Sequence, residues 1–187
     1  MTTWMQGSFP GHEVNVVFAR GLTLEVLTQG LRERLREPLA FGEADGWAWA
    51  VHDMLNWEAD DYDTVNYNSM CADGAEIVVF VTEPCSAKAF PPDFAYHRGG
   101  RMILGFSFDG PQYRVGENPD YLSPELLAAR LIGPDAACPQ EGADTHDCFD
   151  HHYDDHERLV KAIADFFALP SPPLAVPLSP SPEVTAK

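Results

Sequence analysis

Positive charge is scarce in this sequence. Its 187 residues include 12 Lys and Arg against 29 Asp and Glu, a formal net charge of −17 at pH 7. Residues 37–87 and residues 131–157 contain no Lys or Arg at all. Nucleic acids and anionic membranes are bound through cationic contacts, so the charge argues against direct binding to either. The composition favours solubility, and it is compatible with a basic protein partner or with mimicry of nucleic-acid charge.

Long apolar runs and paired cysteines are also missing. No apolar stretch approaches the roughly 20 residues that a membrane-spanning helix needs. Within residues 1–13, no basic residue precedes an apolar stretch. The chain is therefore expected to carry neither a membrane anchor nor a secretory signal. The four cysteines, Cys71, Cys85, Cys138 and Cys148, form no C-x-x-C pair. Reduced thiols and a cytoplasmic location are the simplest expectation.

Sequence motifs of the common enzyme classes are absent as well. The chain contains no G-x-S-x-G nucleophile elbow, no Walker phosphate loop, no H-E-x-x-H metal motif and no dinucleotide-binding glycine pattern. Those motifs hold nucleophiles, phosphates or metal ions at fixed spacings, so their absence leaves no reaction class predicted. Whether the protein is an enzyme stays open, and a non-enzymatic role is favoured.

A pair of glycines between two apolar runs is the clearest local signal that is present. Gly99-Gly100 predicts a two-residue β-hairpin loop, because both positions of such a loop need positive φ. The loop sets a register in which Arg98 faces Arg101 and Tyr96 faces Ile103. This register predicts one core face, made of Ala95, His97, Met102, Leu104, Phe106 and Phe108.

Further strands and helices follow from β-branched runs and from apolar residues at helical spacing. Strands are predicted at residues 14–19, 46–52 and 76–82, and helices at 24–35 (with Thr23 as N-cap), 123–132 and 150–169. The pattern predicts a single α+β domain over residues 14–169, with a mainly antiparallel sheet, a β-meander over residues 46–108 and helices packed on one face. Residues 1–13 are expected to form a flexible arm and residues 170–187, with six prolines, a disordered tail.

Several short segments follow one another in a suggestive order. They are Phe18-Ala19-Arg20-Gly21-Leu22-Thr23, then Gly46-Trp47-Ala48-Trp49-Ala50-Val51, then Phe94, Tyr96, Gly100-Arg101 and Phe106, and finally Arg114-x-Gly116-x-x-Pro119-Asp120-x-Leu122. Over roughly residues 14–132 this order resembles an uncharacterised actinobacterial family, domain of unknown function family 6461. The acidic residues 55–71 and the His-rich segment near residue 150 depart from it. The resemblance implies a bacterial cytosolic α+β domain and implies no activity.

Aromatic and acidic residues are mixed in one segment of the lysine- and arginine-free stretch. Aromatic side chains among carboxylates suit a contact surface for a basic protein. The predicted partner-binding residues are Trp57, Glu58, Asp60, Asp61, Tyr62 and Asp63. Two alternatives stay open, because paired carboxylates also serve general acid–base catalysis and closely spaced acids are often simply solvated.

Histidine and cysteine recur every four residues at the start of the last predicted helix. On a helix, Cys148, His152 and His156 share one face, and Asp155 offers a further oxygen ligand. Such residues can ligate zinc or another divalent transition metal. The alternative is an acidic, solvated helix start whose carboxylates complement the helix dipole, with the histidines held by neighbouring carboxylates.

The predicted hairpin register opposes two like charges. Arg98 directly across from Arg101 is unfavourable unless an anion or a carboxylate stands between them. Arg114 could join them, which would make the three arginines an anion-binding site. An internal carboxylate is the favoured partner, since acids are abundant and no glycine-rich phosphate loop is present.

These features rank three functional hypotheses. The preferred one is a non-enzymatic cytosolic interaction or regulatory module, of the inhibitor, immunity or decoy type, without a cofactor. Its acidic surface would bind a basic protein partner. The second is a zinc- or other metal-binding protein, or a metal-dependent enzyme, that uses the Cys148–His156 cluster. The third is a binder of a small anionic ligand. The sequence does not predict the oligomeric state.

Overall fold

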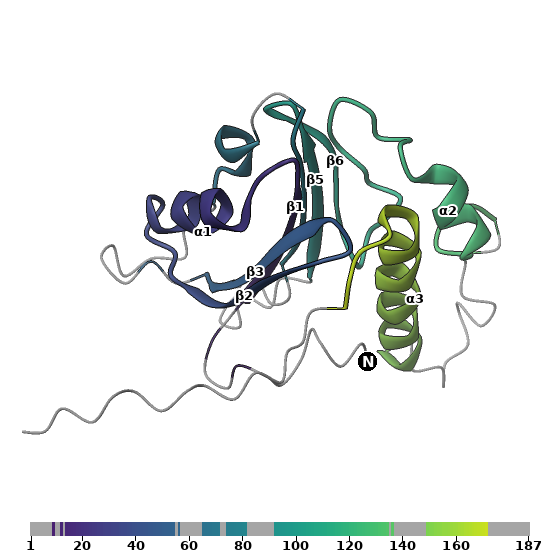
Figure 1. Cartoon of the computed structure of the whole chain (residues 1–187). Helices are drawn as coiled ribbons and strands as arrows, with labels where there is room; N and C mark the ends of the chain where they lie inside the picture. The colour runs from purple at the N-terminus through teal and green to yellow at the C-terminus, as the bar shows by residue number, and fades with distance from the viewer. Residues whose placement is uncertain are drawn as a thin grey trace, which may run out of the picture.

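The computed structural model describes residues 9, 12, 14–54, 56, 65–71, 74–81, 92–134, 136 and 149–171, with the backbone alone at 149–154. A six-stranded antiparallel sheet forms the centre of this part of the chain (Figure 1). Its strands are β1 (Val14–Arg20), β2 (Pro38–Ala44), β3 (Trp47–Asp53), β4 (Glu76–Val81), β5 (Asp93–Arg98) and β6 (Arg101–Ser107). The predicted α+β class is confirmed. Of the predicted tail the structure describes only Pro170 and Ser171, and of the predicted arm only Phe9 and His12.

The strand order is β2-β3-β1-β4-β5-β6, which differs from the predicted meander. The continuous meander holds for β4, β5 and β6 only, because β1 lies between β3 and β4 and pairs with both. The reason is β1 itself, which is apolar on both faces and therefore suits a central position. Strand β2 has no counterpart among the predicted strands, because Pro38 at its start is a residue typical of the position just after a helix.

Helices cover both faces of the sheet, which corrects the expectation of one covered face. On one face lie α1 (Leu24–Arg32) and the short 3-10 helix η1 (Tyr67–Met70), and on the other lie α2 (Ser123–Ala128) and α3 (Phe149–Phe167). The side chains of β1 and β4 alternate between the two cores. With apolar residues on both faces, a sheet must be covered on both sides to remove them from water.

The Gly99-Gly100 loop forms as predicted, with φ of 56° and 77°, and Arg98 pairs with Arg101. Beyond the loop the register differs, since Tyr96 pairs with Leu104 and not with Ile103. A β-bulge accommodates one extra residue on β6 and shifts every later side chain by one position.

The bulge changes the composition of the predicted core face. Leu104 and Phe106 share their core with Phe94 and Tyr96, which belong to the face covered by α2 and α3. His97 lies on the other face, toward η1. The prediction that Ala95 and His97 share a face with Leu104 and Phe106 is therefore wrong, although Leu104 and Phe106 are core residues.

The N-cap predicted for α1 is confirmed. Thr23 is the N-cap of α1, and its Oγ1 accepts a hydrogen bond from the Val26 backbone N–H at 3.2 Å. In β3, Trp47, Trp49 and Val51 face the core under α3, and the alanines between them face α1. Among the described residues, no helix is long and apolar enough to cross a membrane.

Candidate functional site

A row of charged side chains crosses the sheet beside the hairpin loop. Arg20 of β1 pairs with Glu76 of β4, Glu76 pairs with Arg98 of β5, and Arg98 pairs with Arg101 of β6. Directly paired residues of antiparallel strands point to the same face, so the four side chains stand side by side on the α2–α3 face. The row is continued by Glu117, which follows β6 in the chain.

Internal carboxylates separate the arginines of this row. The Arg20 guanidinium donates to the Glu76 carboxylate and lies 4.6 Å from the centre of the Trp47 ring. Arg98 Nε is 3.7 Å from Glu76 Oε1, and Arg101 Nη1 donates to Glu117 Oε1 at 2.6 Å. The favoured interpretation of the opposed arginines, an internal carboxylate partner, is therefore confirmed for both.

A pocket of about 670 Å³ opens beside the same row. Its lining includes Arg98, Arg101, Ile103, Glu117, Asn118 and Tyr121. The arginine side chains are 59% and 68% exposed, so their remaining N–H groups reach solvent in the pocket. Because Glu76 serves two arginines, this row holds three guanidinium groups against two carboxylates. The pocket thus has a small local excess of positive charge on a strongly acidic chain.

Arg114 does not line this pocket. Its guanidinium donates to the backbone carbonyls of Pro111 and Pro119, at 2.9 and 2.7 Å, and to the Asp120 carboxylate at 3.1 Å. These bonds hold the loop between β6 and α2 in shape, and the Arg114 bond keeps the pKa of Asp120 below its usual value. Of the three arginines predicted to form an anion site, Arg98 and Arg101 therefore line the pocket, whereas Arg114 stabilises the loop.

The metal hypothesis is only partly covered by the described residues. His156 Nε2 donates to Asp109 Oδ1 at 2.9 Å, and Asp155 is paired with Arg158. Cys148 lies outside the described residues, as does the His152 side chain. No group of three potential metal ligands occurs within the described part of the chain. Where His156 and Asp155 can be seen, their partners are protein side chains, and the metal site stays a prediction.

The predicted partner-binding residues cannot be placed in the same way. Trp57, Glu58, Asp60, Asp61, Tyr62 and Asp63 all lie outside the described residues. The flanking strand β3 ends at Asp53, and the chain is described again from Val65, immediately before η1. In the sequence, the acidic segment therefore falls between the end of β3 and η1.

A buried polar cluster under η1 was not predicted. The His52 ring is fully buried and its Nδ1 donates to the Asp53 carbonyl at 2.7 Å. Because Nδ1 carries the proton, Nε2 accepts from the Tyr67 hydroxyl at 2.8 Å. The same hydroxyl accepts from Asn15 Nδ2 at 2.8 Å. Asn15 within an otherwise apolar strand was the available sequence signal, but its partners come from distant segments.

The cluster is suited to holding η1 on the sheet and not to proton transfer near neutral pH. Burial lowers the pKa of His52 to about 4 and raises the pKa of Tyr67. Both groups are therefore uncharged near neutral pH. On the next strands His97 Nδ1 donates to Asn68 Oδ1 at 2.7 Å, and burial lowers the pKa of His97 to about 4 as well. The two histidines bond to Tyr67 and Asn68, the first two residues of η1, and fasten its beginning to the sheet.

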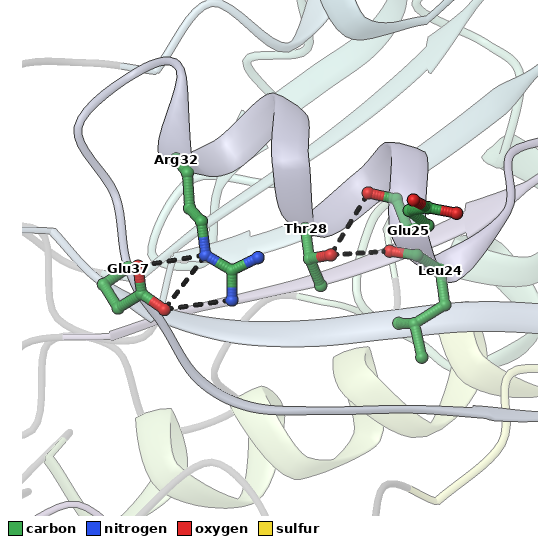
Figure 2. A network of polar contacts seen from close by, with 5 residues as sticks. All are labelled: Leu24, Glu25, Thr28, Arg32 and Glu37. Atoms are coloured by element: carbon green, nitrogen blue, oxygen red, sulfur yellow. Dashed lines mark hydrogen bonds and ion pairs between the residues drawn. The ribbon is translucent and has the colours of Figure 1, made fainter.

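The described cations are largely neutralised by the chain's own acids. Of the ten Lys and Arg that the structure describes, seven form ion pairs with carboxylates: Arg20, Arg32, Arg98, Arg101, Arg114, Arg158 and Lys161. Acids that form no ion pair with a described residue are exposed on α1 and β2 and at the residues that directly follow them: Glu25, Glu33, Glu43 and Asp45. Figure 2 shows how Arg32 of α1 turns toward Glu37 on this same surface.

Comparisons with protein families, with curated proteins and with solved structures found no match to this chain. The resemblance to domain of unknown function family 6461 therefore stays a prediction. The α+β class rests on the sheet and helices themselves, and a functional assignment has to rest on the surfaces described above.

Proposed function

We propose that the protein is a non-enzymatic interaction module that binds a basic protein partner. The supporting observation is the distribution of charge. Most of the described arginines and lysines are engaged by carboxylates of the same chain. Among the described residues, no ion pair is formed by the exposed acids Glu25, Glu33, Glu43 and Asp45. A surface of this kind attracts a basic partner over long range and repels nucleic acids and acidic proteins.

The test is affinity capture with the full chain as bait over a series of salt concentrations. Attraction between exposed charges is screened within about 8 Å at physiological ionic strength, so capture should weaken steeply with salt. Neutralising the predicted contact segment with Asp60→Asn, Asp61→Asn and Asp63→Asn should weaken capture and flatten its salt dependence. The matched control carries the same change in net charge in the second arginine-free stretch, as Asp135→Asn, Glu141→Gln and Asp144→Asn.

The two sets of variants separate local contact from overall charge. Loss of capture in the first set alone supports residues 57–63 as part of the contact surface. An equal loss in both sets supports attraction by net charge without a contact at that segment. Captured proteins that are acidic, or capture that ignores salt, contradict the proposal.

A second candidate function is the binding of a small anionic ligand in the hairpin pocket. The observation that favours it is the excess of guanidinium groups over carboxylates beside an open pocket. Arg98→Gln and Arg101→Gln should each remove saturable binding of inorganic phosphate or of a small dicarboxylate, measured by calorimetry. Arg32→Gln is the matched control, because Arg32 is also an exposed arginine paired with one glutamate. Weak, non-saturating heats that are equal in all variants would reject this candidate.

A further inference from the structure

The two edges of the sheet differ. At the β6 edge the backbone groups of the strand are bonded by the loop 113–118. Gly105 and Val115 exchange N–H···O bonds of 2.8 and 2.9 Å, and the Glu117 N–H donates to the Met102 carbonyl. At the β2 edge no described residue forms a backbone hydrogen bond to the outer side. An uncovered edge offers a row of directional donors and acceptors to another strand.

The turn after β2 identifies which backbone groups point outward. Asp45 and Gly46, with φ of 52° and 80°, form a two-residue loop, so the flanking Ala44 and Trp47 are a hydrogen-bonded pair. Hydrogen-bonded pairs then recur at every second residue. The backbone N–H and C=O groups of Phe41 and Glu43 consequently face away from β3.

Side chains around this edge combine apolar and acidic character. Phe41 is 49% exposed, and Val26 and Leu35, which lie on α1 and on the link to β2, are 52% and 44% exposed. Helix α1 packs against β2, and the three residues lie on these two elements or on the link between them. The same elements and the residues that directly follow them carry exposed carboxylates: Glu25, Glu33, Glu37, Glu43 and Asp45. Figure 2 shows the exposed cation Arg32 of this surface held by Glu37.

The edge also carries protective features, but only at its beginning. Pro38 and the irregular pairing between Pro38 and Ala40 are devices that discourage strand addition. From Ala40 to Ala44 the register with β3 is regular. The regular part has no lysine or proline, the residues that natural edges use to block pairing.

We propose that the β2 edge docks an extended, basic segment of the partner protein as a seventh strand. This inference rests on the proposed function and specifies how the partner binds. The backbone groups of Phe41 and Glu43 supply the hydrogen bonds, and the Phe41 ring supplies an apolar contact. Lysine or arginine side chains of the added strand then meet the surrounding carboxylates. A second copy of this chain would instead bring the same acids face to face.

The experiment uses a synthetic peptide of about ten residues, a usual strand length, in which Lys alternates with Val. Amide hydrogen exchange of the ¹⁵N-labelled full chain is followed by NMR. At a peptide concentration about ten times the dissociation constant, exchange of the Phe41 and Glu43 amides should slow by about tenfold. The Gly42 amide, which pairs with β3, is the internal reference and should change little. A peptide that alternates Glu with Val should have no effect.

Two variants examine the roles of charge and backbone. Glu37→Lys with Glu43→Lys should lose the Lys peptide and gain the Glu peptide, whereas Asp155→Lys with Asp165→Lys on α3 should keep the original preference. Phe41→Pro removes one outward N–H without removing a bond to β3, so it should fold and fail to bind. An amide spectrum that keeps its dispersion verifies folding in each case, and Phe41→Ala replaces any variant that does not fold.

The outcomes distinguish this inference from the proposed function. Binding of the Lys peptide with exchange protection elsewhere on the chain overturns the β2 site and leaves the basic-partner function standing. Absence of binding by any basic peptide, together with failed capture of basic proteins, overturns both. Slow exchange of the Phe41 amide in the free chain, or a dimer in sedimentation, means that another occupant covers the edge and overturns the inference.

Discussion

Lowering the pH from about 7 to about 5 should destabilise the fold through two buried neutral histidines, His52 and His97. Burial lowers the pKa of each ring to about 4, from an ordinary value of 6.5. The unfolded chain therefore takes up protons before the folded one does. The stability that the neutral rings contribute is present above pH 6.5 and is lost as the pH falls toward 4.

The magnitude follows from the two pKa values. Between about pH 7 and about pH 5, a shift of this size removes about 2 kcal/mol of unfolding free energy for each histidine. Two histidines would remove about 4 kcal/mol, a large share of the roughly 5–15 kcal/mol that holds a domain folded. Carboxyl groups have ordinary pKa values of about 4, below this window, so relief of a net charge of −17 is expected mainly at lower pH.

The assay is chemical denaturation at several pH values for the parent chain and for His97→Gln, in which an amide can still bond to Asn68. The variant can be less stable at every pH, but its stability should vary less with pH by about 2 kcal/mol over the window. An NMR titration of the parent imidazoles gives the same information without a variant. The reasoning would be refuted if the unfolding free energies of parent and variant changed equally with pH, or if His97 of the folded chain titrated near its ordinary pKa.

Three further predictions concern the core, a glycine that lies close against β6, and the metal hypothesis. Leu104→Asp places an unpaired carboxylate in the core and should abolish the cooperative melt, because its cost of several kcal/mol approaches the stability of the domain. Leu127→Asp, at a half-exposed site, is the control and should still melt cooperatively. Gly116→Ala puts a Cβ 2.4 Å from the Ile103 carbonyl oxygen of β6 and should strongly lower the free energy of unfolding. In Gly46→Ala the new Cβ has no heavy atom within 4 Å, so this control should cost only about 1 kcal/mol, from its positive φ. Zinc added to the untagged chain should raise its melting temperature only if the Cys148–His156 cluster binds metal, and an unchanged melt with no bound metal would reject that hypothesis.

Much of the sheet could be predicted because its strands carry strong local signals. The β-branched runs of β1 and β4, the alternating residues of β3 and the glycine loop all agree with their final structure. Strand β2 escaped prediction because its Pro, Gly and Glu residues lower strand propensity, and these are the residues an edge position tolerates. The bulge near Ile103 left no signal in the sequence, yet it reversed the faces of one strand relative to its neighbour.

The candidate sites were predictable only where one hairpin determined them. Arg98 and Arg101 meet because a two-residue loop fixes their register, and that register was available from the sequence. The carboxylates that separate them come from β4 and from the loop after β6, which only the folded chain brings together. The contact between His52 and Tyr67 likewise depends on the folded chain, because the two residues are 15 positions apart in the sequence.

Net charge by itself cannot select one partner, and this is why the β2 edge matters for the proposed function. Charge acts over about 8 Å in physiological salt and raises the association rate for any basic protein. Hydrogen bonds to the Phe41 and Glu43 backbone and contact with the Phe41 ring act only at close range, so they govern how long a correct partner stays. Acids far from β2 should then affect the association rate and its salt dependence, whereas Phe41→Ala should raise the dissociation rate and leave association nearly unchanged. A partner whose dissociation rate ignores Phe41 would be held by a different surface of the acidic chain.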